Sequence, residues 1–219
     1  LGSGFKLALR DLEIRGAGNL LGAEQHGHIA NIGFELYCQL LEEAVSKLKG
    51  DVKDVPPEPS LDLNINAYLP EKYIPDGRQK IDIYKAVAAA KSEAEVGELE
   101  AEIRDRFGHL PREARNLLSV ARIKILLREV GLESMRQRGE EIWLEPGPGF
   151  SLPLGEIQRE LGRFRRRLLI DRGRKPPRIT VRIRDLEDNE LLDLLLEILT
   201  ALVSLAAEEG IGYNETSTL

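Results

Sequence analysis

The spacing of apolar residues divides the chain into helical and extended segments. Residues 34–49 carry their apolar side chains at helical spacing, and Gly50 is typical of the residue that ends a helix. The next segment, 51–60, contains three prolines and few apolar groups, which indicates a linker. In 61–66, apolar and polar residues alternate as they do in a half-buried strand. The pattern therefore predicts a domain boundary within 51–60.

Three helices are predicted after this strand. Apolar residues recur at helical spacing in 77–91, 92–108 and 111–131. Ser92 and Glu95 have the spacing of a capping box, in which the serine accepts a hydrogen bond from a helix amide and the glutamate reaches back to the serine's own amide. Glycine ends the second and the third segment, which is typical of a helix C-terminus.

Two hairpins and two further helices complete the predicted elements. The alternating segments of the hairpins are 133–137 with 141–145 and 168–170 with 179–183, and the helices are 154–163 and 188–209. The last helix is apolar on most of its circumference, which places it in the middle of a core.

These elements predict an α+β fold in two parts. Residues 1–50 form a helical hairpin-like segment, and residues 61–219 form a compact domain of helices packed on a small, mainly antiparallel sheet. The composition, 42% hydrophobic and 31% charged residues, is that of an ordinary globular protein. The chain begins with Leu1 and holds one methionine, so we expect it to be a piece of a longer protein.

The sequence also limits the compartment in which the protein works. No apolar run approaches the roughly 18–20 residues that span a bilayer, so no membrane partner is predicted. Cys38 is the single cysteine, which excludes an intramolecular disulfide and fits a reducing compartment. We therefore expect a cytoplasmic protein.

The net charge of −6 is unevenly distributed. Residues 163–178, called the basic strip below, hold eight basic side chains and one acidic one, whereas 185–219 hold nine acidic side chains and no Lys or Arg. One interpretation is a solvated face that the acidic last helix balances. The other is an independent nucleic-acid-binding module that uses the strip, although the acidic balance of the whole chain argues against it.

No catalytic or metal site is predicted. The chain lacks a glycine-rich loop ending in Gly-Lys-Ser/Thr, so we do not expect it to hydrolyse ATP alone. His26 and His28 lack a third nearby ligand for a metal, and His109 beside Pro111 fits a helix junction. Cys38 lies on an apolar helix face and is interpreted as a core residue. No cofactor is expected within this chain.

The stretch 11–22 followed by Gln25 is the most specific motif. Glycines at 16, 18 and 22 permit a sharp corner after a short helix that carries Arg15. Arginine at such a corner can bind a phosphate or a carboxylate through two hydrogen bonds. Glutamine can form hydrogen bonds without carrying a charge, which fits a loop that moves. The alternative is that Arg15 pairs with Glu13 or Asp11 and only holds the corner.

This motif resembles the translocation motif of RecG-like DNA translocases. The resemblance implies that Arg10, Glu13, Arg15 and Gln25 couple the closure of ATP-driven motor domains to movement along double-stranded DNA. Unlike RecG, this chain continues well beyond the motif, through Tyr68-Leu69-Pro70 and Asp105-Arg106-Phe107-Gly108. That order is similar to the C-terminal end of the bacterial transcription–repair coupling factor family.

Membership of that family implies a parent ATPase with partners that the chain itself does not reveal. The parent binds ATP and Mg²⁺ in its motor domains, displaces stalled RNA polymerase and recruits UvrA for nucleotide excision repair. Its C-terminal domain covers a UvrB-like N-terminal module and so inhibits UvrA recruitment. The resemblance places this autoinhibitory contact at 102–106.

The helical spacing agrees with such a contact. Glu102, Asp105 and Arg106 lie at i, i+3 and i+4, on another face than the apolar residues Ile103 and Phe107. They are predicted to form an inter-domain latch. The alternative is a local surface ion cluster that contributes little energy.

Overall fold

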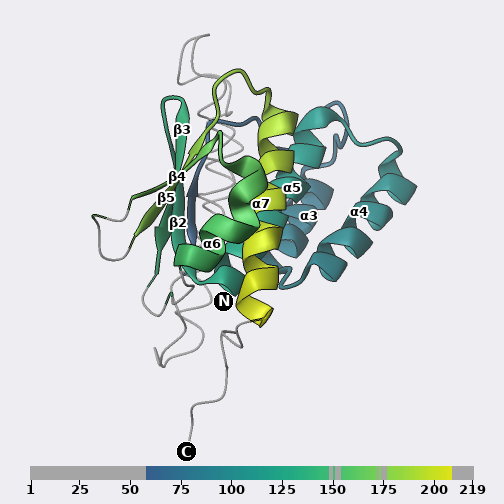
Figure 1. Cartoon of the computed structure of the whole chain (residues 1–219). Coiled ribbons are helices and arrows are strands. Elements are labelled where there is room, and N and C mark those ends of the chain that lie inside the picture. The colour runs from purple at the N-terminus through teal and green to yellow at the C-terminus, as the bar shows by residue number, and fades with distance from the viewer. Residues whose placement is uncertain (1–57, 148–149, 151–153, 172, 174–176, 209–219) are drawn as a thin grey trace, which may run out of the picture.

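The described part of the chain is a five-stranded sheet with helices on one face (Figure 1). The computed structural model describes residues 58–147, 150, 154–171, 173 and 177–208. The predicted helical segment 1–50, including the translocation motif, lies outside the described residues. Among the described helices, none combines the length and apolar character needed to cross a membrane.

The sheet is mainly antiparallel, as predicted. Its strands are β1 (Ser60–Asp62), β2 (Leu132–Arg138), β3 (Glu141–Pro146), β4 (Leu168–Asp171) and β5 (Arg178–Arg182). They are ordered β1-β2-β3-β5-β4, with β1 parallel to β2 and the other three pairs antiparallel. Both predicted hairpins are confirmed, and their alternation points Ile142, Leu144 and Val181 into the core.

The predicted strand after the linker is only partly correct. β1 begins at Ser60 and ends at Asp62, where the chain leaves the sheet. Buried and exposed side chains still alternate over the residues that follow. The buried ones are Leu63, Ile65, Ala67 and Leu69. In this segment, the backbone forms hydrogen bonds with side chains instead of with a neighbouring strand. The Asn64 amide donates to Gln137 Oε1 (2.8 Å), and Asn116 Nδ2 donates to the Asn66 carbonyl (2.8 Å). The alternation of apolar and polar residues therefore reflects the burial of every second side chain and not pairing with a neighbouring strand.

The five helices predicted between residues 77 and 209 form, with small changes at their ends. They are α3 (Gly77–Ala89), α4 (Glu93–Phe107), α5 (Arg112–Val130), α6 (Leu154–Glu160), the 3₁₀ turn η1 (Leu161–Phe164) and α7 (Asp188–Glu208). The predicted helix 154–163 is thus a short α-helix that tightens into a 3₁₀ turn. Gly108 and Gly131 end α4 and α5 at φ 81°, a value that side chains with a Cβ disfavour.

The capping box at the start of α4 is present with one altered bond. Ser92 Oγ accepts a hydrogen bond from the Glu95 amide at 3.3 Å, as predicted. Glu95 Oε2, however, accepts from the amide of Lys91 at 2.7 Å and not from that of Ser92. The glutamate therefore holds the α3–α4 connection as well as the helix start.

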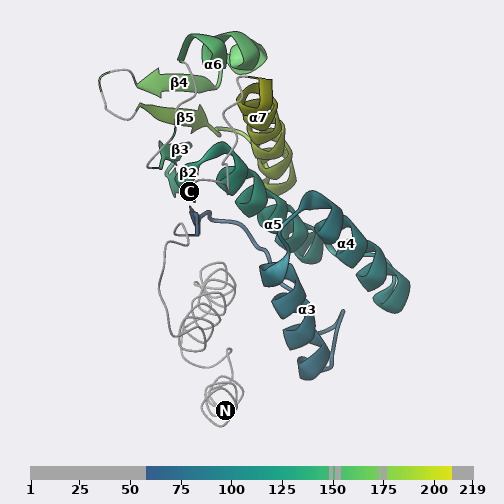
Figure 2. The ribbon, with the colours of Figure 1, turned by 90° about the horizontal axis from the view of Figure 1, so that it is seen from below.

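The core is centred on α7, as its apolar circumference predicts. α7 lies between α5 and α6 and packs against both (Figures 1 and 2). Its buried residues are Leu191, Leu192, Leu195, Ile198, Leu199, Leu202, Leu205 and Ala206. α5 contributes a second large apolar face, and the inner face of the sheet closes the core. Burial of these side chains supplies most of the stabilisation of the domain.

Candidate inter-domain contact surface

α4 lies on the side of the helical layer away from the sheet (Figures 1 and 2). Only Val96 and Ile103 of this helix are fully buried, and they face the neighbouring helices α3 and α5. The apolar stripe of α4 is thus narrow, and its two buried residues pack within the domain. Most of the remaining helix surface is exposed and charged.

The three residues predicted for a latch lie together on this exposed surface. Arg106 Nη1 is 2.6 Å from Glu102 Oε1, and the two side chains are 43% and 57% exposed. Asp105 is exposed and forms no ion pair with any described residue. An exposed pair of this kind contributes about 0.2–1 kcal/mol. The local ion cluster therefore joins two of the three residues and stabilises the domain only slightly.

A groove between α3 and α4 continues this surface. It has a volume of about 280 Å³. Its lining is Ala86, Ala89, Ala90, Glu95, Glu98, Leu99 and Glu102. Small apolar side chains and Leu99 meet three carboxylates here, so the groove suits a partner that offers a small apolar side chain beside a cation. The sequence interpretation missed Glu95 and Glu98, although their spacing to Glu102 (i, i+3, i+7) places all three on one helical face.

Contacts outside the exposed face hold α4 in position. Arg122 Nη2 on α5 is 2.7 Å from Glu100 Oε2, and Arg104 Nη2 is 2.8 Å from the other oxygen of the same carboxylate. The partly buried pair with Arg122 ties α4 to α5. The charged surface is therefore presented by a helix whose orientation is already defined, which lowers the ordering cost of binding.

Tyr73 closes the C-terminal end of α4. Its hydroxyl donates to the Gly108 carbonyl at 3.0 Å, and its ring lies 6.1 Å from that of Phe107. Burial raises the pKa of the Tyr73 phenol, and nearby Arg104 opposes part of this rise. The phenol therefore stays protonated near neutral pH, as its donor role requires. The Arg106 guanidinium lies 5.0 Å from the Phe107 ring centroid, so this end of α4 joins the latch residues to the packed ring pair.

The basic strip does not form one surface in the described residues. Arg178 lies over the Trp143 ring at 3.9 Å on the outer face of the sheet. Arg167 Nη1 donates to the carbonyls of Arg182 and Arg184. The described strip residues form no ion pair with α7, so the predicted balance between strip and acidic helix is not seen there. Because these arginines lie on separate surfaces, the described residues provide no single site for the nucleic-acid-binding interpretation.

The remaining candidates lie outside the described residues. These are Arg10, Glu13, Arg15 and Gln25 of the motif, together with His26, His28 and Cys38. Within the described ranges, no group of three or more His, Cys, Asp or Glu residues could hold a metal ion.

Comparison with known proteins agrees with the fold and with the family resemblance. The TRCF domain family matches residues 63–150. The transcription-repair-coupling factor of Bacillus subtilis (strain 168) is 41% identical over 205 residues, which is 92% of this chain. That of Staphylococcus haemolyticus is 45% identical over 144 residues, or 65% of the chain. The chain spans only 17% and 12% of the length of these two relatives.

A solved structure extends the comparison to three dimensions. The crystal structure of a C-terminal domain of transcription-repair coupling factor matches with a TM-score of 0.65 and 26% identity. The match covers 70% of this chain and 96% of that domain. Its coverage includes nearly all of the solved domain, so the α+β fold described above is that of the domain. The chain therefore belongs to the transcription-repair coupling factor family and represents its C-terminal region.

Proposed function

We propose that this chain supplies two control elements of an ATP-dependent double-stranded DNA translocase that acts in transcription-coupled repair. The motif in 1–50 couples the motor domains to DNA, and the folded domain restrains the recruitment of UvrA. ATP and Mg²⁺ bind to motor domains of the parent protein, and the chain alone does not hydrolyse ATP. Family membership supports the first element, and the exposed surface of α4 supports the second.

The observation that carries the restraining role is the charged face of α4. Its carboxylates at Glu98 and Asp105 have no cation partner among the described residues, and Glu98 lines a groove with a small apolar floor. A surface that is polar, partly apolar and held by a fixed helix suits an interface that must open when another protein competes. The UvrB-like module of the parent is the proposed occupant.

Replacing Glu102, Asp105 and Arg106 together by alanine in the full-length protein should raise its affinity for UvrA. Loss of the latch removes a competitor for the UvrB-like module, and couplings of this kind change affinities by roughly 5–150-fold. Binding of purified UvrA to the variant, measured by calorimetry, checks this. The matched control replaces Asp62 and Arg138, an ion pair of similar exposure on the sheet, and should leave the affinity unchanged. Equal affinity of the triple variant and the wild type would refute the latch.

Replacing Arg15 or Gln25 by alanine in the full-length protein should separate ATP hydrolysis from RNA polymerase displacement. ATP turnover should persist, because the motor domains are intact, while displacement of a stalled polymerase from DNA should be lost. Both rates are measured on the same preparation, with His28→Ala in the same predicted loop as the control. A variant that displaces polymerase as fast as the wild type contradicts the coupling role.

A further inference from the structure

β4 is an edge strand of the sheet, and the described residues supply no strand beyond it. It pairs on its other side with β5, in a register that places Leu168 opposite Val181 and Ile170 opposite Ile179. Just before β4, the Arg182 amide donates to the Arg167 carbonyl at 2.7 Å. Hydrogen-bonded pairs alternate in an antiparallel ladder. The N–H and C=O groups of Leu168 and Ile170 therefore point away from β5, toward the open edge.

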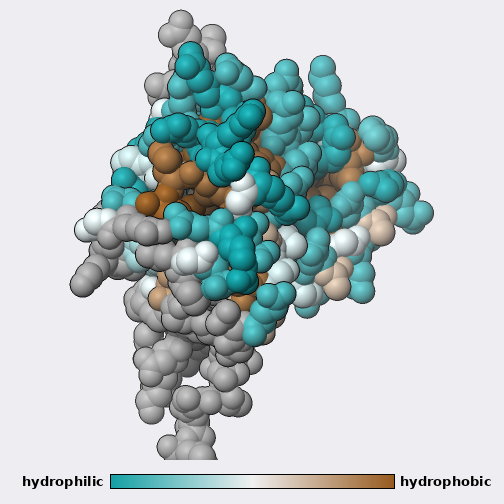
Figure 3. Space-filling model, viewed as in Figure 1, coloured by the Kyte–Doolittle hydropathy of each residue, from teal (hydrophilic) through white to brown (hydrophobic). Residues whose placement is uncertain are grey.

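A groove lies beside this open edge. It separates β4 from α6 and η1 and has a volume of about 540 Å³. Its lining is Ile157, Gln158, Leu161, Gly162, Arg165, Leu168 and Ile170. Ile157 and Leu161 are buried and form an apolar floor, while Leu168 and Ile170 are partly exposed from the strand side. Figure 3 shows apolar surface in a hollow in this part of the molecule, bordered by hydrophilic side chains.

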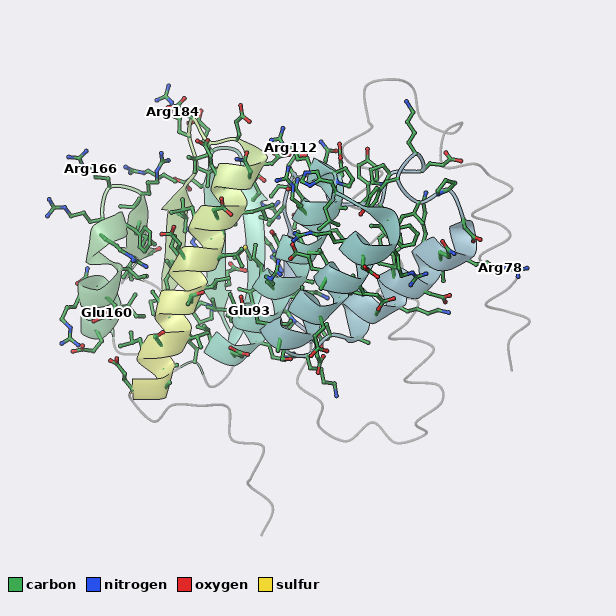
Figure 4. All side chains as sticks on the ribbon, turned by 90° about the vertical axis from the view of Figure 1, so that its right-hand side faces the viewer. Arg78, Glu93, Arg112, Glu160, Arg166 and Arg184 are labelled. Carbon is green, nitrogen blue, oxygen red and sulfur yellow. The ribbon has the colours of Figure 1, made fainter. Side chains whose placement is uncertain are left out.

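The rim of the groove is basic. Arg163, Arg165 and Arg166 follow one another around the end of η1, and none of them forms an ion pair with a described carboxylate. Arg163 lies 4.6 Å from the Phe164 ring centroid, and Arg166 lies at the periphery of the fold (Figure 4). The nearby carboxylates of Glu156 and Glu160 pair instead with Arg159. Three arginines are thus available to an acidic ligand.

We propose that this groove binds an extended, acidic peptide segment of a partner protein by strand addition to β4. The peptide backbone bonds the outward N–H and C=O groups of Leu168 and Ile170, and alternate apolar side chains enter the groove. Carboxylates of the peptide where it passes the start of β4 lie near Arg163, Arg165 and Arg166, which follow one another around the end of η1. An acidic peptide is favoured over a neutral one because the three rim arginines form no ion pair with a described carboxylate. This site is separate from the α4 surface, so it does not depend on the function proposed above.

The test uses the complete 219-residue chain and a fluorescent eight-residue peptide in which Val or Ile alternates with Glu. Its binding is measured by fluorescence anisotropy. Gly162→Leu adds a side chain to the lining of the groove, at a position where an added Cβ meets no atom within 4 Å. This variant should weaken binding at least about tenfold. Gly155→Leu on α6 is the matched control, since an added Cβ there also meets no atom within 4 Å and Gly155 does not line the groove. It should bind as the wild type does.

Two further comparisons make the result specific. Arg165→Glu should weaken the peptide at least about tenfold, whereas Arg184→Glu, an exposed arginine elsewhere, should not. A peptide methylated on alternate backbone nitrogens should bind weakly, because strand addition needs its N–H groups. The proposal is overturned if the wild type fails to bind at about 1 mM peptide, or if a peptide of the same composition without alternation binds equally. A dimer of the chain that Gly162→Leu disrupts would assign the edge to a second copy and also overturn it.

Discussion

Leu199→Ala should lower the free energy of unfolding of the 219-residue chain by about 2–5 kcal/mol. Leu199 is 0% exposed and lies on α7, at the centre of the core. Shortening its side chain removes buried methyl groups and leaves a cavity that the surrounding helices and sheet fill only in part. Urea unfolding followed by circular dichroism measures the change, and the slope with denaturant should stay the same.

Leu169→Ala provides the matched control for this change. Leu169 is 45% exposed on the outer face of the sheet, so the same chemical truncation creates no internal cavity. It should alter the free energy of unfolding by less than about 1 kcal/mol. A cost at Leu199 no larger than that at Leu169 would show that α7 is not central to the core.

Asn116→Asp should destabilise the folded chain by about 2–4 kcal/mol near neutral pH. Asn116 is 3% exposed, and its Nδ2 donates to the Asn66 carbonyl at 2.8 Å. The introduced carboxylate has nearly the same shape but no proton to donate, so a buried charge faces a carbonyl oxygen. Urea unfolding at several pH values measures the effect.

The pH dependence of this variant has a definite sign. Burial raises the pKa of the introduced carboxyl group above its unfolded value of about 3.9. The variant therefore approaches wild-type stability at acid pH, where the protonated group can donate to Asn66, and loses stability as the pH rises through the folded pKa. Asn64→Asp, at an exposed position in the same segment, is the control. A neutral-pH cost equal to that of the control contradicts the structural role of Asn116.

Local patterns were sufficient for most of the elements. Helix starts and ends follow from short signals such as Ser92 with Glu95 at one end of α4 and Gly108 at the other, because capping depends on neighbouring residues. Both hairpins also follow from alternation on either side of a short connection. These signals act over a few residues, so the sequence alone carries them.

Long-range contacts were not predictable from the same patterns. The strand expected after the linker alternates correctly, yet β1 is short because the residues after Asp62 bond to Gln137 and Asn116 on other elements. The same difference between local and long-range information applies to the candidate surface on α4. Spacing placed Glu102, Asp105 and Arg106 on one helical face, whereas the groove that adds Glu98 exists only because α3 lies beside α4.

β1 also determines how the domain responds to mechanical tension. The strand is the first described part of the sheet, and its partner strand lies far along the sequence. Asp62 lies opposite Arg136 in the ladder, and its carboxylate accepts a hydrogen bond from Arg138, 76 residues later. A pull along the strand axis loads its three pairs with β2 together, because parallel hydrogen bonds are spaced evenly along the ladder. The strand must then shear as a unit before the helices behind it are disturbed. A force applied through the residues before β1 therefore acts on three parallel pairs at once and not on one pair after another.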